Sequence, residues 1–301
     1  MRMNRTLPTA ITEQNNDHIP GENEYIGEDG LIYCSICHEP KEKPIPEDSF
    51  CSFLQFHPRD CACERRMRKE EKEQRHMEEH LRTVTHLRSI CFQSPFMHNW
   101  TFENSKYDNE QQRTAKNYVK NWKYYKQHNS GLLFWGGVGT GKSYLAACIA
   151  NALIDREVSV RMITLADVLN HKGEDRAEFI QELCSPSLLI LDDFGMERDT
   201  SFGVEIVSLV VNTRVKMNMP LILTTNLPYD EIKNAPDTDH ERIYSRIRGV
   251  TVPVKFSGPD LRVFMQKQHL ADMKEMMRKE DICDERDDES SDSPKDDADH
   301  S

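Results

Sequence analysis

The sequence predicts an α/β fold in which a parallel sheet lies between layers of helices. Two observations predict the sheet: apolar runs of strand length alternate with helical stretches, and the first run leads through a glycine-rich turn into a helix. A third observation predicts a separate small module ahead of the sheet, because five of the nine cysteines fall within residues 34–63. A charged helix is predicted between the module and the sheet.

The two ends of the chain carry too few apolar residues to form a core. Residues 1–30 are polar and show neither helical nor strand periodicity, and residues 281–301 hold ten acidic and two basic side chains. We expect both ends, 1–30 and 279–301, to be disordered. The net charge of −12 belongs largely to this acidic tail, so it does not exclude a protein that binds nucleic acid.

Two classes of protein are excluded at this stage. The chain has no run of about 18 apolar residues, so no membrane-spanning helix and no membrane partner are expected. Its first residues lack the apolar stretch of a secretory signal, which predicts a cytoplasmic location.

The cysteines of residues 31–63 form a spacing typical of a metal site. Two close pairs are separated by a loop, Cys34-x-x-Cys37 and Cys61-x-Cys63. Each pair supplies two thiolates from one tight turn, which suits tetrahedral Zn²⁺, and cytosolic disulfides are rare. Cys51 is the main alternative ligand, in place of Cys61 or Cys63, and His38 and His57 are lesser alternatives. A module this small cannot bury a sufficient core alone, so the metal would stabilise its fold.

Residues 64–90 read as an exposed, charged helix. Acidic and basic side chains are interspersed, helix propensity is high, and ion pairs four residues apart are available. We interpret this segment as a linker helix. The alternative is a DNA-contacting helix through a basic group consisting of Arg65, Arg66, Arg68 and Lys69.

Four apolar runs read as buried strands: Gly131–Trp135, Val158–Ile163, Ser187–Leu191 and Leu221–Thr225. Helical stretches separate them, notably around Glu174–Cys184 and Phe202–Met217. Continuous apolar strands that alternate with helices are typical of a parallel sheet covered on both faces.

The turn after the first strand fits the phosphate-loop pattern G-x-x-x-x-G-K-[ST]. Its residues are Gly136, Gly137, Val138, Gly139, Thr140, Gly141, Lys142 and Ser143. Glycines let backbone N–H groups curl around a phosphate, and the following helix offers its positive end. Lys142 would neutralise the β- and γ-phosphates of ATP, and the Ser143 hydroxyl would coordinate Mg²⁺.

A second half of the nucleotide site follows in the run Leu188 to Asp193, which ends in two acids. Asp192 would hold Mg²⁺, directly or through water. Asp193 is placed to orient or deprotonate the attacking water. Beyond the fourth strand, Asn226 is positioned to reach the γ-phosphate or that water.

Three arginines follow on one predicted helix, Arg242, Arg246 and Arg248. A guanidinium that contacts the γ-phosphate of a neighbouring subunit would stabilise charge in the transition state. A solvated basic face is the alternative interpretation.

At this point the motifs resemble a known family. GGVGTGKSYLAACIANAL, LLILDDFGMER, LILTTNLP and ERIYSRIRG follow in order, as in the DnaC/IstB-like AAA+ ATPases, and the resemblance covers about residues 100–262. It implies a five-stranded parallel sheet and ATP hydrolysis at subunit interfaces formed by self-association. It also implies that Asn226 is a sensor, that Arg246 is the arginine finger and that Arg262 is a second-sensor arginine.

The cysteine pairs and the charged helix resemble the zinc-bearing helicase loaders of Gram-positive bacteria and their phages or mobile elements. In such loaders the N-terminal module grips the replicative helicase, the ATPase domain contacts single-stranded DNA, and hydrolysis releases the helicase. We therefore expect a helicase loader. The alternatives are an IstB-like transposition helper and a nucleotide-gated adaptor with little turnover, since an aspartate at 193 reaches less far than a glutamate.

The expected organisation divides the chain into five parts. A disordered N-terminus (1–30) precedes a zinc-binding module (31–63) and a charged linker helix (64–90). An AAA+ ATPase domain (91–278) and a disordered acidic tail (279–301) follow.

Overall fold

The computed structural model describes residues 19–46, 56–105, 108–171, 175–195 and 201–263, together with 266–267, 270–271, 273–274 and 276. The chain divides into two compact units, Met1–His80 and Leu81–Ser301. Within the described ranges, no helix combines the length and apolar character that a membrane span requires. Residues 1–18 of the predicted disordered N-terminus, all of the predicted tail (279–301) and Cys51 lie outside the described residues.

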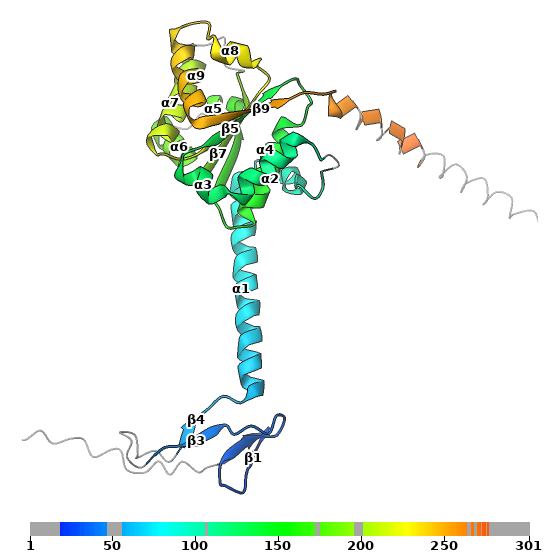
Figure 1. The fold of residues 1–301 in the computed structure, drawn as a ribbon, viewed down its shortest axis with the longest axis vertical. Coiled ribbons are helices and arrows are strands. Elements are labelled where there is room, and N and C mark those ends of the chain that lie inside the picture. The colour runs from blue at the N-terminus through cyan, green and yellow to red at the C-terminus, as the bar shows by residue number, and fades with distance from the viewer. Residues whose placement is uncertain are drawn as a thin grey trace, which may run out of the picture. The chain divides into compact units, whose positions relative to one another are not determined.

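The C-terminal unit contains a five-stranded parallel sheet (Figure 1). Its strands are β5 (Gly131–Gly136), β6 (Val160–Thr164), β7 (Leu188–Phe194), β8 (Leu221–Thr225) and β9 (Thr251–Phe256). They lie in the order β6-β7-β8-β5-β9. This sheet confirms the predicted α/β fold and its five parallel strands.

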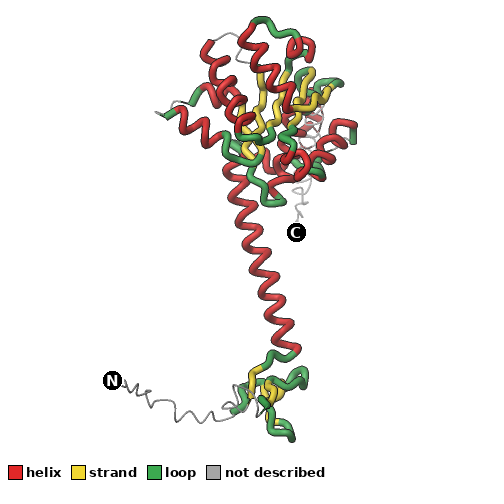
Figure 2. Tube along the Cα trace, turned by 60° about the vertical axis from the view of Figure 1, so that its left-hand side comes forward, coloured by secondary structure: helices red, strands yellow, loops and turns green. Residues whose placement is uncertain are grey.

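Helices cover both faces of the sheet, so the strands lie in the middle of three layers (Figure 2). One face packs against the end of α1 and against α2 and α4, and the other packs against α5 to α9. Successive side chains of β5 point to opposite faces of the sheet. Leu132 and Phe134 lie in the core on the α2 and α4 side, and Leu133 lies in the core on the α5 to α9 side. The bounds of these elements are α1 (Ala62–Cys91), η1 (Pro95–Asn99), α2 (Glu110–Lys120), α3 (Trp122–Gln127), α4 (Lys142–Ile154), α5 (Leu165–Leu169), α6 (Arg176–Leu183), α7 (Ser201–Lys216), α8 (Tyr229–Lys233) and α9 (Thr238–Val250).

Strand β9 is the strand of this sheet that the apolar pattern did not reveal. It is an edge strand, paired with β5 alone among the described strands, and its residues Val252, Pro253 and Lys255 are exposed. Proline is tolerated at a sheet edge because its missing N–H costs no hydrogen bond there. The strand therefore lacks the continuous apolar run of the four predicted strands.

The N-terminal unit is built from two short antiparallel pairs. Strand β1 (Glu24–Ile26) pairs with β2 (Ile32–Cys34), and β3 (Glu42–Pro44) pairs with β4 (Phe56–Pro58). The unit offers few buried apolar side chains, with Ile32, Cys34 and Cys61 the buried ones among its described residues. A bound metal is the usual substitute for a core of this size.

A buried arginine fastens the amino ends of two strands. Arg214 of α7 is 0% exposed, and its guanidinium donates to the carbonyls of Cys184 (2.8 Å), Pro186 (2.6 Å), Ser187 (3.2 Å) and Pro220. Burial lowers the pKa of Arg214 to about 10, which leaves it charged at neutral pH. Its charge is spread over carbonyl dipoles that precede β7 and β8.

Replacing Arg214 with methionine is expected to lower the free energy of unfolding by about 3 kcal/mol or more, because several buried carbonyls lose a charged donor. Urea denaturation of the two proteins measures the change. Lys216→Met, an exposed position two residues further along α7, should change stability by less than about 0.5 kcal/mol. Equal effects of the two substitutions would show that the buried hydrogen bonds contribute nothing.

Candidate functional site

The phosphate loop lies where the carboxyl ends of β5, β7 and β8 meet. It begins at Gly136, the last residue of β5, and leads into Lys142, the first residue of α4. Gly136 has φ +139° and Gly141 has φ +91°, conformations that L side chains rarely adopt. A Cβ at Gly136 would also collide with the carbonyl of Phe256 in β9. The glycine spacing of the motif is therefore a backbone requirement of this turn.

The Lys142 side chain is held inside this turn. Its ammonium donates to the Gly136 carbonyl at 3.0 Å, the Gly137 carbonyl at 2.7 Å and Asn226 Oδ1 at 2.7 Å. Burial lowers the pKa of Lys142, and the carboxylates of Asp193 and Asp192 act against that change. The structure thus brings together the predicted phosphate lysine and the predicted sensor asparagine, which follow the neighbouring strands β5 and β8.

Asp192 is buried beside the start of α4. Its Oδ1 accepts a hydrogen bond from Thr224 Oγ1 at 2.5 Å, and the Ser143 hydroxyl also bonds to its carboxylate. Burial raises the pKa of Asp192, whereas these two hydrogen bonds lower it. A carboxylate and a hydroxyl side by side are oxygen donors of the kind that Mg²⁺ prefers.

Asp193 occupies an unusual backbone position. Its φ is +55°, in the left-handed region, and the β7–β8 register shifts between Leu191 and Phe194. Its N–H donates to Thr224 Oγ1 at 3.0 Å. Strained backbone and bulges of this kind persist where neighbouring structure enforces them, often at functional sites. The bulge leaves Asp193 exposed while Asp192 stays buried.

Thr224 is the site residue that the sequence reasoning missed. It is fully buried, yet it serves both acids, because its hydroxyl donates to Asp192 and accepts from the backbone of Asp193. The available signal was a pair of threonines ending an otherwise apolar strand.

The segment after β9 lies against the phosphate loop. The Leu261 N–H donates to the Gly139 carbonyl at 3.0 Å, and a Cβ at Gly139 would collide with the Asp260 carboxylate. The positive charge of Arg262 contributes to the lowered pKa of Lys142. Arg262 therefore lies near enough to the phosphate-loop lysine to act on its charge, and its role as a second-sensor arginine stays a prediction.

Arg246, the predicted arginine finger, does not contact the phosphate loop of its own chain. It is exposed on α9, and its guanidinium donates to Asn212 Oδ1 on α7 rather than to the phosphate loop. Arg248 pairs with Glu241 at 2.8 Å and donates to the Ile232 carbonyl at 2.5 Å, so it fastens α8 to α9. Of these two arginines, Arg246 is the more accessible to a neighbouring subunit.

Four cysteines of the N-terminal unit converge: Cys34, Cys37, Cys61 and Cys63. Their sulfur atoms all lie within 4.8 Å of one another. Four sulfurs bound at 2.3 Å around one tetrahedral Zn²⁺ would be roughly 3.8 Å apart, so the cluster fits such an ion after a small contraction. Backbone N–H groups of Glu39 and Cys63 lower the pKa of Cys37 to about 6. They stabilise the thiolate form, which is the form that binds metal.

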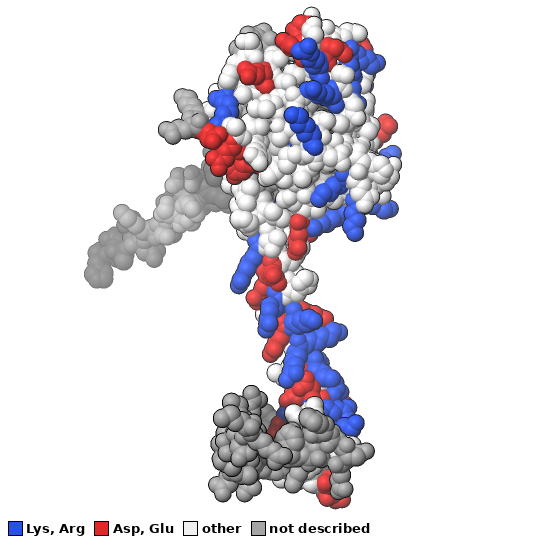
Figure 3. All heavy atoms as spheres, turned by 90° about the vertical axis from the view of Figure 1, so that its left-hand side faces the viewer, with Lys and Arg blue, Asp and Glu red and all other residues white. Residues whose placement is uncertain are grey.

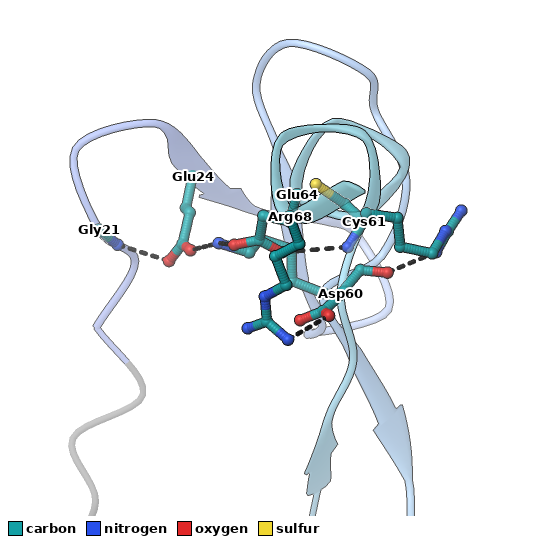
Figure 4. Close-up of polar contacts among 8 residues, drawn as sticks. Gly21, Glu24, Asp60, Cys61, Glu64 and Arg68 are labelled. Carbon is teal, nitrogen blue, oxygen red and sulfur yellow. Dashed lines mark hydrogen bonds and ion pairs between the residues drawn. The ribbon is translucent and has the colours of Figure 1, made fainter. Parts of the chain in front are cut away.

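Ion pairs tie the start of α1 to this cluster (Figure 4). Glu64, in the first turn of α1, accepts from the Cys61 N–H at 3.1 Å and pairs with Lys41 at 2.7 Å. Lys41 also pairs with Glu24 of β1, and these hydrogen bonds raise the pKa of Lys41. Cys63 lies within α1, so the first turns of this helix and the cysteine cluster belong to the same folded unit.

The basic side chains at the start of α1 are already paired. The ion pairs are Arg65–Glu39 (2.8 Å), Arg68–Asp60 (2.5 Å), Arg66–Glu70 (4.0 Å) and Lys69–Glu73 (3.8 Å). Acidic and basic side chains are intermixed along the helix (Figure 3). This arrangement favours the charged-helix interpretation over a DNA-contacting one.

Removing zinc is expected to unfold the cysteine cluster and leave ATP affinity unchanged, because the phosphate loop lies in the other unit. We expect about one zinc ion per chain, lost in Cys61→Ser and kept in Cys51→Ser. Metal analysis and ATP titration with and without a chelator measure both effects. Zinc loss from Cys51→Ser would contradict the ligand assignment, and collapse of ATP affinity on chelation would contradict the independence of the two units.

Comparison with known families identifies the chain. Residues 64–240, more than half of its length, match the family model described as IstB-like ATP binding protein. The chain belongs to the IstB-like ATP binding protein family. This membership confirms the resemblance, and it agrees with the phosphate loop and the five-stranded AAA+ sheet.

Two curated relatives of this family member are proteins of Escherichia coli (strain K12). The protein named Uncharacterized protein YdaV is 31% identical over 146 residues, which cover 46% of this chain and 59% of YdaV. Replicative helicase loader DnaC is 27% identical over 162 residues, which cover 51% of this chain and 65% of DnaC. The matches thus span about three fifths of the length of these relatives.

Among solved structures, the crystal structure of DnaI matches with a TM-score of 0.50 and 23% identity. The match covers 58% of this chain and 98% of the DnaI chain. At this identity the match supports the fold of the IstB-like ATP-binding unit.

Proposed function

We propose that the chain is an ATP-dependent loader of the replicative DNA helicase. The observation that carries this proposal is the 162-residue similarity to replicative helicase loader DnaC, in a chain whose phosphate-loop lysine, acidic strand end and sensor asparagine converge. ATP binding would assemble neighbouring ATPase domains on single-stranded DNA. Hydrolysis would then release the helicase.

The residues of the phosphate loop suit the triphosphate of ATP. The three acceptors of the Lys142 ammonium are uncharged, so β- and γ-phosphate oxygens would give it stronger, charge-assisted bonds. Ser143 and Asp192 would hold the Mg²⁺ that accompanies ATP and balances charge on the phosphates. Asn226 would contact the γ-phosphate, and Arg262 would approach the nucleotide from the segment after β9.

Hydrolysis would use one group from this subunit and one from its neighbour. Asp193 is exposed next to the buried Asp192 and would orient the attacking water. Arg246 would enter the neighbouring subunit's site and stabilise charge on the transferred phosphate.

The cysteine cluster would serve the helicase rather than catalysis. Zinc held by four thiolates has no open position for water, so its role would be structural. Because Glu64 pairs with Lys41 and accepts from the Cys61 N–H, the cluster and the first turns of α1 would present one surface to the helicase.

A nucleotide-gated adaptor with slow turnover is the second candidate. The Asp193 side chain is shorter than that of a glutamate, so its carboxylate reaches less far toward an attacking water. The left-handed backbone conformation of Asp193 also restricts where this side chain can be placed. A turnover rate that stays very low with DNA and helicase present would favour the adaptor.

Co-purification tests the proposal. The full chain, with ATP, should retain the purified replicative helicase of the same organism, and chelation of zinc should abolish the complex. Retention of a transposase instead of the helicase would favour the IstB-like transposition helper and contradict the loader.

A further inference from the structure

A group of basic side chains on α2 and α3 is not used by the nucleotide site. Between Arg113 and Gln127 the sequence has five basic residues and no acidic one, although the whole chain has a net charge of −12. The five are exposed, and we call them, with Tyr124, the α2–α3 basic surface: Arg113, Lys116, Lys120, Lys123 and Lys126.

The core fixes where these side chains point. Ala115, Tyr118, Val119 and Trp122 of the same helices are buried in the sheet core, so the basic residues occupy the opposite, solvent-facing side. Lys116 and Lys120 are four residues apart on α2, which separates them by about 6 Å along the helix axis. The positive charges are therefore held on rigid helices rather than on a loop.

These charges remain largely unneutralised. Arg113 lies 3.7 Å from Asp108, but no ion pair among the described residues involves Lys116, Lys120, Lys123 or Lys126. Lys126 donates instead to the Ser187 hydroxyl at 3.2 Å. The basic side chains at the start of α1, Arg65, Arg66, Arg68 and Lys69, are by contrast each paired with an acid. Unpaired positive charge of this density is suited to a polyanion.

An aromatic side chain lies among the lysines. Tyr124 is 60% exposed, and its ring packs on His128 with centroids 4.2 Å apart. Tyr125 supports it edge-on at 5.8 Å and in turn packs on the buried Tyr118 at 4.6 Å. An exposed ring braced in this way offers a base a stacking surface at little cost in side-chain entropy.

This surface is separate from the phosphate loop. Helix α3 leads into the amino end of β5, and Lys126 contacts Ser187, which immediately precedes β7. The phosphate loop lies at the carboxyl ends of the same strands. A ligand on the basic surface would therefore leave Lys142 and Asp192 free for nucleotide.

We propose that the α2–α3 basic surface binds single-stranded DNA. The lysines contact backbone phosphates, and Tyr124 stacks on an unpaired base. Single-stranded DNA carries an unstacked base beside every phosphate, whereas an acidic polypeptide has no aromatic group regularly beside its charges, and bases in a duplex are already stacked. The proposal deepens the proposed function, because that function includes DNA binding by the ATPase domain without saying where.

The experiment measures the anisotropy of a fluorescent oligo(dT) of about twenty nucleotides, titrated with the full chain at several salt concentrations. The test variant is Lys120→Gln/Lys123→Gln/Lys126→Gln. The matched control is Lys216→Gln/Lys233→Gln/Lys255→Gln, which removes three exposed lysines from other parts of the same unit. ATP affinity, measured alongside, should be the same in all proteins and reports correct folding.

The test variant should bind about tenfold or more weaker at 0.1 M salt, and the slope of log affinity against log salt should fall by about 2, since each lost phosphate contact removes about 0.7. The control should match the wild type. Tyr124→Ala should weaken binding by about fivefold or more, and Tyr124→Phe should restore it.

Three outcomes would overturn the proposal: equal binding by the test and control variants, equal affinity of the wild type for duplex DNA, or no binding by the wild type. Loss of DNA binding in the test variant, in a chain that retains no helicase, would support this surface while contradicting the loader. Failure of the DNA-binding surface can thus be distinguished from failure of the proposed loader function.

Discussion

Lys142→Ala is expected to lower the affinity for ATP by about a hundredfold or more, because two charge-assisted contacts to phosphate are lost and each contributes about 1.5–3 kcal/mol. The same substitution removes the hydrogen-bond donor of Asn226 Oδ1 and of the Gly136 and Gly137 carbonyls. These residues are not buried, so water can take the place of the lysine ammonium. Isothermal titration with ATP and Mg²⁺ measures the affinity.

Lys216→Ala, at the exposed end of α7, is the matched control and should bind ATP as the wild type does. Thermal unfolding without nucleotide should show that the Lys142 variant is folded. Wild-type affinity in a folded Lys142→Ala protein would exclude the phosphate loop as the ATP site.

Arg246→Ala is expected to leave ATP affinity unchanged and to reduce turnover by about a thousandfold, the effect of removing an arginine finger supplied by a neighbour. In this structure the Arg246 guanidinium bonds to Asn212 and not to the phosphate loop. Steady-state phosphate release measures turnover. Arg242→Ala, one turn earlier on α9, removes an exposed arginine that pairs with Asp239 at 3.4 Å, and it should have much less effect.

A mixture of two inactive variants tests whether Arg246 acts between subunits. Arg246→Ala subunits bind ATP, and Lys142→Ala subunits still carry Arg246. Mixing them should restore part of the turnover. Normal turnover by Arg246→Ala alone would remove Arg246 from the mechanism, and an inactive mixture would argue against action in trans.

Much of the ATPase fold was predictable because its inner strands are buried on both faces. Leu221–Thr225 was predicted with the bounds that the structure has, and the other three predicted strands, including the edge strand β6, differ by one to three residues at their ends. Strand β7 extends past Leu191 through Asp192 and Asp193, since ladder pairing and the bulge carry polar residues that an apolar pattern excludes. The edge strand β9 and the short strands β1 to β4 have no such pattern.

The candidate site was predictable where a motif fixes backbone geometry. The glycines around Lys142 and the acids at the end of β7 occupy the places that their spacing indicated. The roles of Thr224 and Arg214 depend on which strands are neighbours in the sheet. Local sequence patterns do not predict the strand order β6-β7-β8-β5-β9. Thr224 meets Asp192 across 32 residues of chain, so tertiary structure was needed to find it.

The central claim, that this chain places a replicative helicase on DNA, is tested most directly by a loading assay. Purified helicase is incubated with circular single-stranded DNA covered by single-strand-binding protein, and helicase on the circle is measured after gel filtration. The wild-type chain with ATP should transfer helicase to the circle, whereas Lys142→Ala, or the wild type without ATP, should not. Equal amounts of helicase on the circle with and without the wild-type chain would contradict the claim.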